Sequence, residues 1–297
     1  MVEWTVSFVE SKRSFASTRA KQLAACRAWH LCPLRRILAS TNEFQANDTR
    51  KGGHMAGEEN LKERIRRGET TIGVIVPYNA TKSQIEDIWG KDDVYNYISV
   101  DSQHNPLNET DLVAVCLAAQ DLSIPVHFRI KHTRYTFQVG NWLDLGPSII
   151  EVPQTETNET AQEAVDYFYY RQFGKRSAGG APRVGLAENN GRLEYAEFWN
   201  NYGVLMLQVE SIQAICNIPR LIRPGVDVIS WGPADLTFDR EANPNHPLSV
   251  SDDACVEYAV KALEGTDTKL MIRNYDWKLR DKYIGMGATV LLESPKP

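Results

Sequence analysis

The segment GVLMLQVESIQAICNIPRLIRPGVDVISWGPADL at residues 203–236 decides the fold class. It contains two short runs, GVLMLQVE at 203–210 and VDVISWG at 226–232, that are almost continuously apolar and do not alternate with polar residues. Strands buried on both faces of a parallel sheet have this pattern, because helices cover each face of such a sheet. The segment therefore predicts two parallel strands joined by a crossover.

Six further runs of the same kind lie elsewhere, and helical patterns separate them. The runs are TTIGVIVP (70–77), YISVD (97–101), PVHFRIK (125–131), PSIIEVP (147–153), TKLMIRN (268–274) and ATVLLE (288–293). The helical patterns lie at 108–121, where Asn108 and Asp111 can cap the first turn, at 158–173, and at 250–265, where Gly265 is a stop signal.

Eight strands alternating with helices between Met55 and Pro297 match a (β/α)₈ barrel. The rival is a doubly wound open sheet, which usually has fewer strands and a glycine-rich phosphate turn after its first strand. Here the first run ends in Pro77-Tyr78-Asn79 and no such turn follows. The α/β barrel is therefore the predicted fold.

The two ends of the predicted barrel are unusual. The segment LKERIRRG (61–68) predicts a short helix before the first strand, able to cover the barrel floor. The sequence stops four residues after Glu293, so we expect a barrel without its final helix. The strip left open on the first and last strands then needs cover from another subunit or from the N-terminal extension.

Composition excludes several classes of protein. The net charge of -5 argues against a protein that binds nucleic acid by neutralising phosphates. No run of about 18 apolar residues is present, so no transmembrane helix is expected. The five cysteines are odd in number and irregularly spaced (Cys26, Cys32, Cys116, Cys216 and Cys255), which indicates reduced thiols in a cytoplasmic protein.

Residues 1–54 differ from the rest of the chain. They contain nine Lys/Arg and four Asp/Glu, a net charge of 9 − 4 = +5, which leaves -10 for residues 55–297. We interpret 1–54 as a disordered basic extension: an organelle presequence, or sequence upstream of a true start at Met55. An ordered extension is the third possibility. The chemistry is expected in residues 55–297.

Barrel active sites lie at the carboxyl ends of the strands, where this chain has several polar residues. Glu210 and Asp235 follow adjacent predicted strands, and two carboxylates without a thiolate or histidine suit Mg²⁺ or Mn²⁺. The alternative is two solvated acids at the rim. Arg129 lies in a buried run and must meet an anion, either a substrate or an internal partner. His104, near Asp101, is a candidate acid–base group or an ordinary loop residue.

These motifs together resemble the HpcH/HpaI aldolases, metal-dependent pyruvate aldolases with a (β/α)₈ barrel of phosphoenolpyruvate/pyruvate type. The resemblance covers about residues 60–293. Its motifs are Asp101-Ser102-Gln103-His104, Arg129, Asp144-Leu145-Gly146, Val152-Pro153, Gln208-Val209-Glu210-Ser211, Gly232-Pro233-Ala234-Asp235-Leu236-Thr237 and Asn243-Pro244-Asn245-His246-Pro247.

The resemblance implies a role for each matched residue. Glu210 and Asp235 would bind a divalent cation (Mg²⁺, Mn²⁺ or Co²⁺), which binds pyruvate and stabilises its enolate. Arg129 would stabilise the developing oxyanion, and His104, oriented by Asp144, would take the hydroxyl proton. Gln208 and the backbone amides of Ala234 and Asp235 would hold the pyruvate carboxylate. Asp101 and Gln103 would lie just outside the ligands.

The chain also departs from the family pattern. Gln103 replaces a glutamate that hydrogen-bonds metal-bound water, so metal binding is expected to be weaker. Ile75 replaces a tryptophan of the bacterial aldolases, which reshapes the aldehyde side of the pocket. Arg273 is an extra cation near the mouth, able to accept an acidic substrate or to form a rim salt bridge. The absent final helix bears on assembly, although a homo-oligomer is still expected.

The leading hypothesis is a carbon–carbon lyase that cleaves a 4-hydroxy-2-oxo acid into pyruvate and an aldehyde, or runs the reverse. One alternative uses the same enolate after decarboxylation of oxaloacetate, as macrophomate synthase does, and the loop Gly174-Lys175-Arg176-Ser177 resembles a loop of that enzyme. The other is a non-catalytic barrel that binds an oxo acid or a protein partner.

Overall fold

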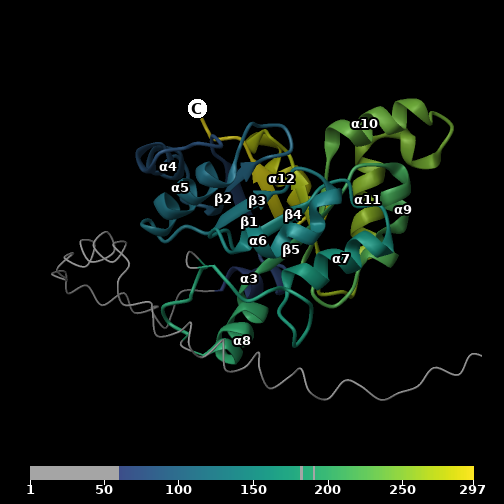
Figure 1. The fold of residues 1–297 in the computed structure, drawn as a ribbon. Coiled ribbons are helices and arrows are strands. Elements are labelled where there is room, and N and C mark those ends of the chain that lie inside the picture. Colours follow the sequence, from purple (N-terminus) through teal and green to yellow (C-terminus); the bar gives the residue numbers. More distant parts are fainter. Residues whose placement is uncertain (1–59, 181–182, 190) are drawn as a thin grey trace, which may run out of the picture. The chain divides into compact units, whose positions relative to one another are not determined.

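The computed structural model describes residues 60–180, 183–189 and 191–297, and these form a closed parallel β-barrel with helices around it (Figure 1). Neighbouring strands along the chain pair in order, and β1 closes the barrel against β8. The strands are β1 (Thr71–Ile75), β2 (Tyr95–Asp101), β3 (Val126–Arg129), β4 (Ile149–Val152), β5 (Val204–Val209), β6 (Val228–Trp231), β7 (Lys269–Arg273) and β8 (Val290–Glu293). The predicted barrel is confirmed, and each strand lies within its predicted run or overlaps it.

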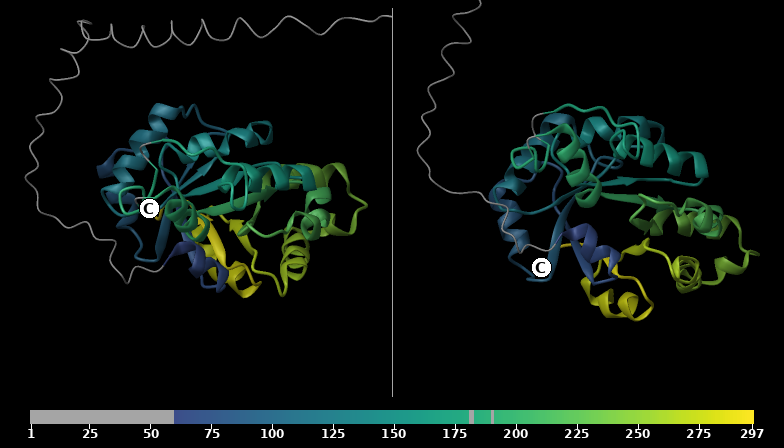
Figure 2. Two further views of the ribbon diagram at one scale, coloured as in Figure 1. Left: turned by 60° about the horizontal axis from the view of Figure 1, so that its bottom comes forward. Right: turned by 90° about the horizontal axis from the view of Figure 1, so that it is seen from below.

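Helices connect the strands, and Figure 2 shows them on the outside of the barrel. They are α3 (Leu61–Arg66), α4 (Lys82–Trp89), α5 (Glu109–Gln120), α6 (Val139–Leu143), α7 (Asn158–Phe168), α8 (Arg192–Tyr202), α9 (Ile212–Leu221), α10 (Pro233–Ala242), α11 (Asp252–Leu263) and α12 (Arg280–Gly285). Short 3₁₀ turns are η1 (Thr133–Gln138), η2 (Pro247–Val250) and η3 (Trp277–Leu279).

Local sequence explains where these helices begin and end. Asn108 and Asp111 form the predicted reciprocal capping box at the start of α5. Helix α7 ends at Phe168, earlier than the predicted 173, because Tyr169 adopts an extended backbone and turns its ring inward. There the Tyr169 hydroxyl donates to the Gly225 carbonyl at 2.8 Å, so a tertiary contact overrides helix propensity.

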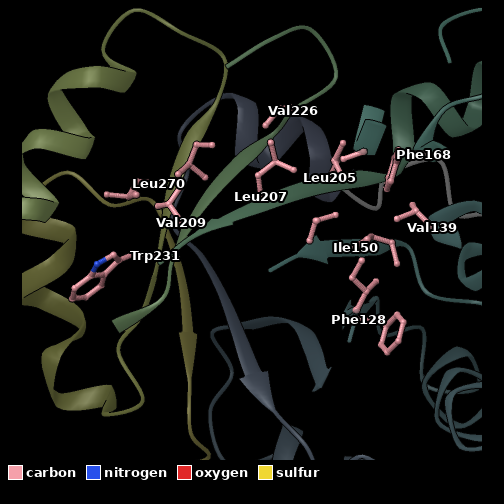
Figure 3. Close-up of a cluster of buried hydrophobic side chains, with 14 of the residues drawn as sticks. Phe128, Val139, Ile150, Phe168, Leu205, Leu207, Val209, Val226, Trp231 and Leu270 are labelled. Carbon is pink, nitrogen blue, oxygen red and sulfur yellow. The ribbon is translucent and has the colours of Figure 1, made fainter. Parts of the chain in front are cut away.

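Side chains of the strands alternate between two hydrophobic clusters. The outer cluster lies between strands and helices, and Figure 3 shows part of it, including Phe128, Ile150, Leu205 and Leu207. The inner cluster fills the amino-terminal end of the barrel; it contains Ile65, Tyr97, Ile149, Val204, Met206, Val228, Met271, Val290 and Leu292. Layers of inward side chains make such a barrel a packed core, so chemistry must lie at its other end.

Helix α3 covers the barrel floor, as the sequence predicts. Its Ile65 belongs to the inner cluster, and its Lys62 is completely buried. The Lys62 ammonium donates to Asp227 Oδ2 at 3.0 Å and to the carbonyl of Gly203 at 2.6 Å. This buried ion pair fixes α3 against the amino ends of β5 and β6.

Only some of the predictions about the two chain ends concern residues that the structure describes. The predictions for residues 1–54 lie outside the described residues. Within the described part, β8 is the last helix or strand. None of the described helices is long and apolar enough to cross a membrane.

Candidate active site

The carboxyl ends of the parallel strands bring most of the predicted site residues to one end of the barrel. Asp101 and Arg129 are the last residues of β2 and β3, which lie side by side. Glu210 directly follows β5, and Asp235 lies in the first turn of α10, which begins after β6. The fold therefore collects these groups where barrel enzymes bind substrate.

Arg129 is buried and paired. Its Nε and Nη2 atoms donate to the two carboxylate oxygens of Asp101 at 2.8 Å each, and Nη1 donates to Gln208 Oε1 at 3.2 Å. Burial would raise the pKa of Asp101, but the hydrogen bonds and charge of Arg129 outweigh burial and hold it below its usual value. The internal partner considered for Arg129 is thus present, and the bidentate pair fixes the guanidinium plane.

Gln208 is held in one orientation by this pair. Its side chain is completely buried, and its carbonyl oxygen accepts from Arg129. Its Nε2 atom has no hydrogen-bond partner among the described residues. A buried amide donor without a partner is costly, so this nitrogen is well suited to donate to a substrate oxygen.

Glu210 is buried against the backbone of Gly232. A Cβ atom at Gly232 would lie 2.5 Å from Glu210 Cγ and 2.6 Å from its Oε1, so any other residue there would force Glu210 to move. The other oxygen, Oε2, accepts from the backbone N–H of Gln154 at 2.8 Å. Gln154 has a φ of 48°, an uncommon conformation for a residue with a side chain, and such residues often occur at functional sites.

The electrostatic environment makes Glu210 unusual. Its pKa is raised to about 7, chiefly by burial; the Gln154 N–H and the charge of Arg129 oppose the shift, and the nearby charges of Asp235 and Asp101 add to it. Glu210 is only 8% exposed, whereas Asp235 is exposed. A cation between the two carboxylates would relieve both burial and repulsion. Their hard oxygens suit Mg²⁺ or Mn²⁺, so the donor set fits such an ion.

The first turn of α10 offers backbone donors beside these carboxylates. Gly232 precedes the helix, Pro233 has no N–H, and the amides of Ala234 and Asp235 have no intrahelical acceptor. Such amides bind anionic oxygens. The described residues contain no group of three or more His, Cys, Asp or Glu side chains placed to share a metal ion. The buried Oε1 of Gln103 has no hydrogen-bond partner within the described part of the chain.

The structure does not bring His104 and Asp144 together within the chain. His104 is exposed at the carboxyl end of β2, and its ring makes no hydrogen bond to the described residues. Asp144 directly follows α6, shortly before the amino end of β4, and accepts a 2.8 Å hydrogen bond from Arg176. Arg176 in turn packs against the ring of Trp199. Helices run from carboxyl to amino strand ends, which explains why the motif before β4 lies away from His104.

A buried polar layer beneath the site was not predicted. His127 Nδ1 is 2.8 Å from the hydroxyl of Ser99, and Nε2 lies 3.3 Å from Glu151 without hydrogen-bond geometry. Burial, then the charges of Arg273 and Arg129, hold the pKa of His127 well below its usual value, so the ring is neutral. The only sequence signal was the spacing of His127 and Arg129, two residues apart, which places both side chains inside the barrel.

Arg273 belongs to this layer and does not lie at the rim. It is 4% exposed and forms an ion pair with the completely buried Glu151. The sequence analysis considered a salt bridge of Arg273 at the rim. Arg273 does form a salt bridge, but with a buried partner and not at the rim.

Comparisons with known proteins agree with this architecture. A sequence profile of the HpcH/HpaI aldolase/citrate lyase family matches residues 95–262. The 2-keto-3-deoxy-L-rhamnonate aldolases of Escherichia coli strains O17:K52:H18 and K12 are each 30% identical over 192 residues, which is 63% of this chain and 69% of theirs.

Solved structures share the fold at lower identity. The HpcH/HpaI aldolase of Desulfitobacterium hafniense DCB-2 has a TM-score of 0.67 and 22% identity, covering 80% of this chain and 90% of that one. Macrophomate synthase has a TM-score of 0.65 and 19% identity, covering 79% and 83%.

The family match and the aldolase relatives identify the closed barrel as an enzyme of the lyase class. The chain belongs to the HpcH/HpaI aldolase/citrate lyase family. Members of this family generally depend on a divalent cation.

Proposed function

We propose that the chain cleaves a 4-hydroxy-2-oxo acid into pyruvate and an aldehyde, or joins the two, with Mg²⁺ or Mn²⁺ held by Glu210 and Asp235. The observation that carries this proposal is Glu210, which is buried against Gly232, has a pKa raised to about 7, and interacts with the charge of Asp235. The protein alone stabilises the charged form of Glu210 poorly. A dication bound there would act as a Lewis acid toward the enolate charge.

The other residues bind the substrate and stabilise charge. The amide nitrogen of Gln208 and the free amides of Ala234 and Asp235 are proposed to hold the substrate carboxylate. Arg129 keeps unused N–H groups on Nη1 and Nη2, which can donate to the oxygen on which negative charge develops. His104, exposed at the mouth, is the proposed base for the 4-hydroxyl proton, and Asp144 of the same chain does not orient it.

The test follows pyruvate release from a 4-hydroxy-2-oxo acid, with Mg²⁺ or Mn²⁺ and with a chelator. We expect the chelator to abolish turnover and Glu210→Gln to lower kcat/KM by about 1,000-fold. Glu257→Gln on the exposed face of α11 is the matched control and should retain full activity. Chelator-insensitive turnover, or full activity of Glu210→Gln, would overturn the metal assignment. Absence of turnover with either metal would favour a binding protein.

A further inference from the structure

A second guanidinium lies inside the barrel, close to the Asp101–Arg129 pair. Arg273 ends β7, and its charge contributes to the lowered pKa of Asp101. Burial, followed by the charge of Arg129, lowers the pKa of Arg273 to about 10. Arg129 and Arg273 are the last residues of β3 and β7, and both side chains are buried.

Most of the hydrogen-bonding capacity of Arg273 is unused. One nitrogen, Nη2, donates to Glu151 Oε2. Its Nε is sealed from solvent and has no partner, and Nη1 donates to none of the described residues. A buried guanidinium nitrogen without an acceptor is costly, and Nε has lost its water without gaining a hydrogen bond to the described residues. Glu151 compensates the charge of Arg273 but does not satisfy these donors.

The neighbouring strands present further unpartnered donors. Gln208 Nε2 on β5 and Ser230 Oγ on β6 are buried without a partner among the described residues, and the two residues are paired across these strands. Together with Arg273 on β7, they form a donor-rich wall along three consecutive strands. Such a wall matches an oxygen-rich, negatively charged group.

We infer that Arg273 is a specificity-determining residue that binds a second anionic group of the substrate, so that the preferred oxo acid is a dianion. This inference rests on the proposed function, in which Gln208 and the α10 amides already hold the first carboxylate. A planar guanidinium with open N–H groups is the protein group best suited to a carboxylate, and Arg273 is the last residue of β7, at the carboxyl end of that strand. A purely structural ion pair would explain the Glu151 contact but not the open nitrogens.

The test measures binding, which does not depend on turnover. Calorimetry with the full-length chain and Mg²⁺ compares 2-oxopentanedioate with 2-oxopentanoate, which has the same five carbons but ends in a methyl group. We expect the dianion to bind about tenfold more tightly. Arg273→Met should reduce this ratio to about one. Arg220→Met, on the exposed face of α9, removes one charge outside the barrel and should leave the ratio unchanged.

A double variant separates a loss of binding from a loss of folding. Arg273→Met leaves Glu151 buried and unpaired, whereas Glu151→Leu with Arg273→Met removes both charges together. The double variant should also lose the preference. A wild-type ratio near one, or a tenfold preference that persists in the folded double variant, would overturn the inference. Pyruvate release in the same preparations tests the proposed function separately, because failure of cleavage leaves the binding ratio readable.

Discussion

The carboxylate of Asp101 accepts two parallel 2.8 Å hydrogen bonds from Arg129 across the ends of β2 and β3. This pair sets the orientation of the rest of the site, because the third nitrogen of Arg129 then donates to Gln208. The amide nitrogen of Gln208 consequently points away from Arg129. One ion pair thus orients the two groups proposed to meet substrate oxygens.

Replacing Asp101 with asparagine should disturb this arrangement. An amide N–H would face the guanidinium where a carboxylate oxygen now accepts, so Arg129 would reorient. We expect kcat/KM to fall about 100-fold and the free energy of unfolding to fall by about 2 kcal/mol, since Asp101 is partly exposed. Steady-state kinetics and urea unfolding measure the two effects. Asp121→Asn, in an exposed pair with Lys82, is the control, and wild-type activity of Asp101→Asn would contradict the prediction.

The fold could be predicted from sequence because local patterns and topology agree. Apolar runs of strand length, short helices and the absence of a phosphate-binding turn together leave few alternatives to the barrel. The capping box of Asn108 and Asp111 is a local signal, so it was predicted correctly. The end of α7 depends on the contact of Tyr169 with Gly225, far along the chain, and local patterns could not show it.

The candidate site was predictable only where it depends on strand ends. Strand ends place Arg129, Glu210 and Asp235 correctly, since parallel strands finish at one side. The side on which Asp144 lies depends on the path of α6, and its partner Arg176 comes from a distant loop. Glu151 and Arg273 could not be paired from sequence, because strands β4 and β7 are not neighbours and meet only across the barrel interior.

Gly232→Ala should displace Glu210. The backbone φ of Gly232 is -99°, which any residue can adopt, so the effect comes from crowding alone. The new Cβ would lie 2.5 Å from Glu210 Cγ, and Glu210 would have to leave its contact with Gln154. We expect metal affinity, measured by calorimetry, to fall by about 100-fold.

The control for this variant is Gly285→Ala at the end of α12, where a Cβ would meet nothing within 4 Å. It should bind metal like the wild type. Equal affinities for both variants would mean that Glu210 does not need its present position.

Metal binding should depend on pH through Glu210. Its pKa of about 7 means that the carboxyl group keeps its proton below neutral pH, and a metal ion must displace that proton. We expect the apparent Kd for Mn²⁺ to rise about tenfold per pH unit below 7 and to be nearly constant above pH 8. Calorimetry between about pH 5.5 and 8.5 measures how this Kd depends on pH. A Kd that does not change with pH would count against Glu210 as a ligand.

The metal-free protein should show the opposite dependence in its stability. Because the folded-state pKa of Glu210 is raised from 4.5 to about 7, the fold favours the protonated form. Protonated Glu210 therefore adds to the free energy of unfolding at low pH, and this stabilisation is lost as the pH rises from about 4.5 to about 7. The Tm of the metal-free wild type should therefore fall more steeply with rising pH over this interval than the Tm of metal-free Glu210→Gln. Thermal unfolding measures both.

Lys62→Met should destabilise the fold without changing the chemistry. The ammonium of Lys62 and the carboxylate of Asp227 are completely buried, so the variant leaves a buried acid with fewer partners. We expect the free energy of unfolding to fall by about 3 kcal/mol in urea. The kcat should stay within about twofold, because this pair lies at the amino ends of the strands. The control is Lys82→Met, because the side chain of Lys82 is 46% exposed. It should change the free energy of unfolding by less than about 0.5 kcal/mol.

Gln103→Glu should strengthen metal binding. The buried Oε1 of Gln103 has no partner among the described residues. If residue 103 faces the metal in the proposed site, a glutamate there adds a third negative charge beside Glu210 and Asp235. Affinity of such sites rises with the number of charged oxygens, so we expect about tenfold tighter Mn²⁺ binding at pH 8. Without metal the same charge repels its neighbours, so the metal-free variant should melt below the wild type and gain more on adding Mn²⁺. Gln213→Glu on the exposed side of α9 carries the same change in net charge and should leave both quantities unaltered. Unchanged or weaker binding by Gln103→Glu would show that residue 103 does not face the metal.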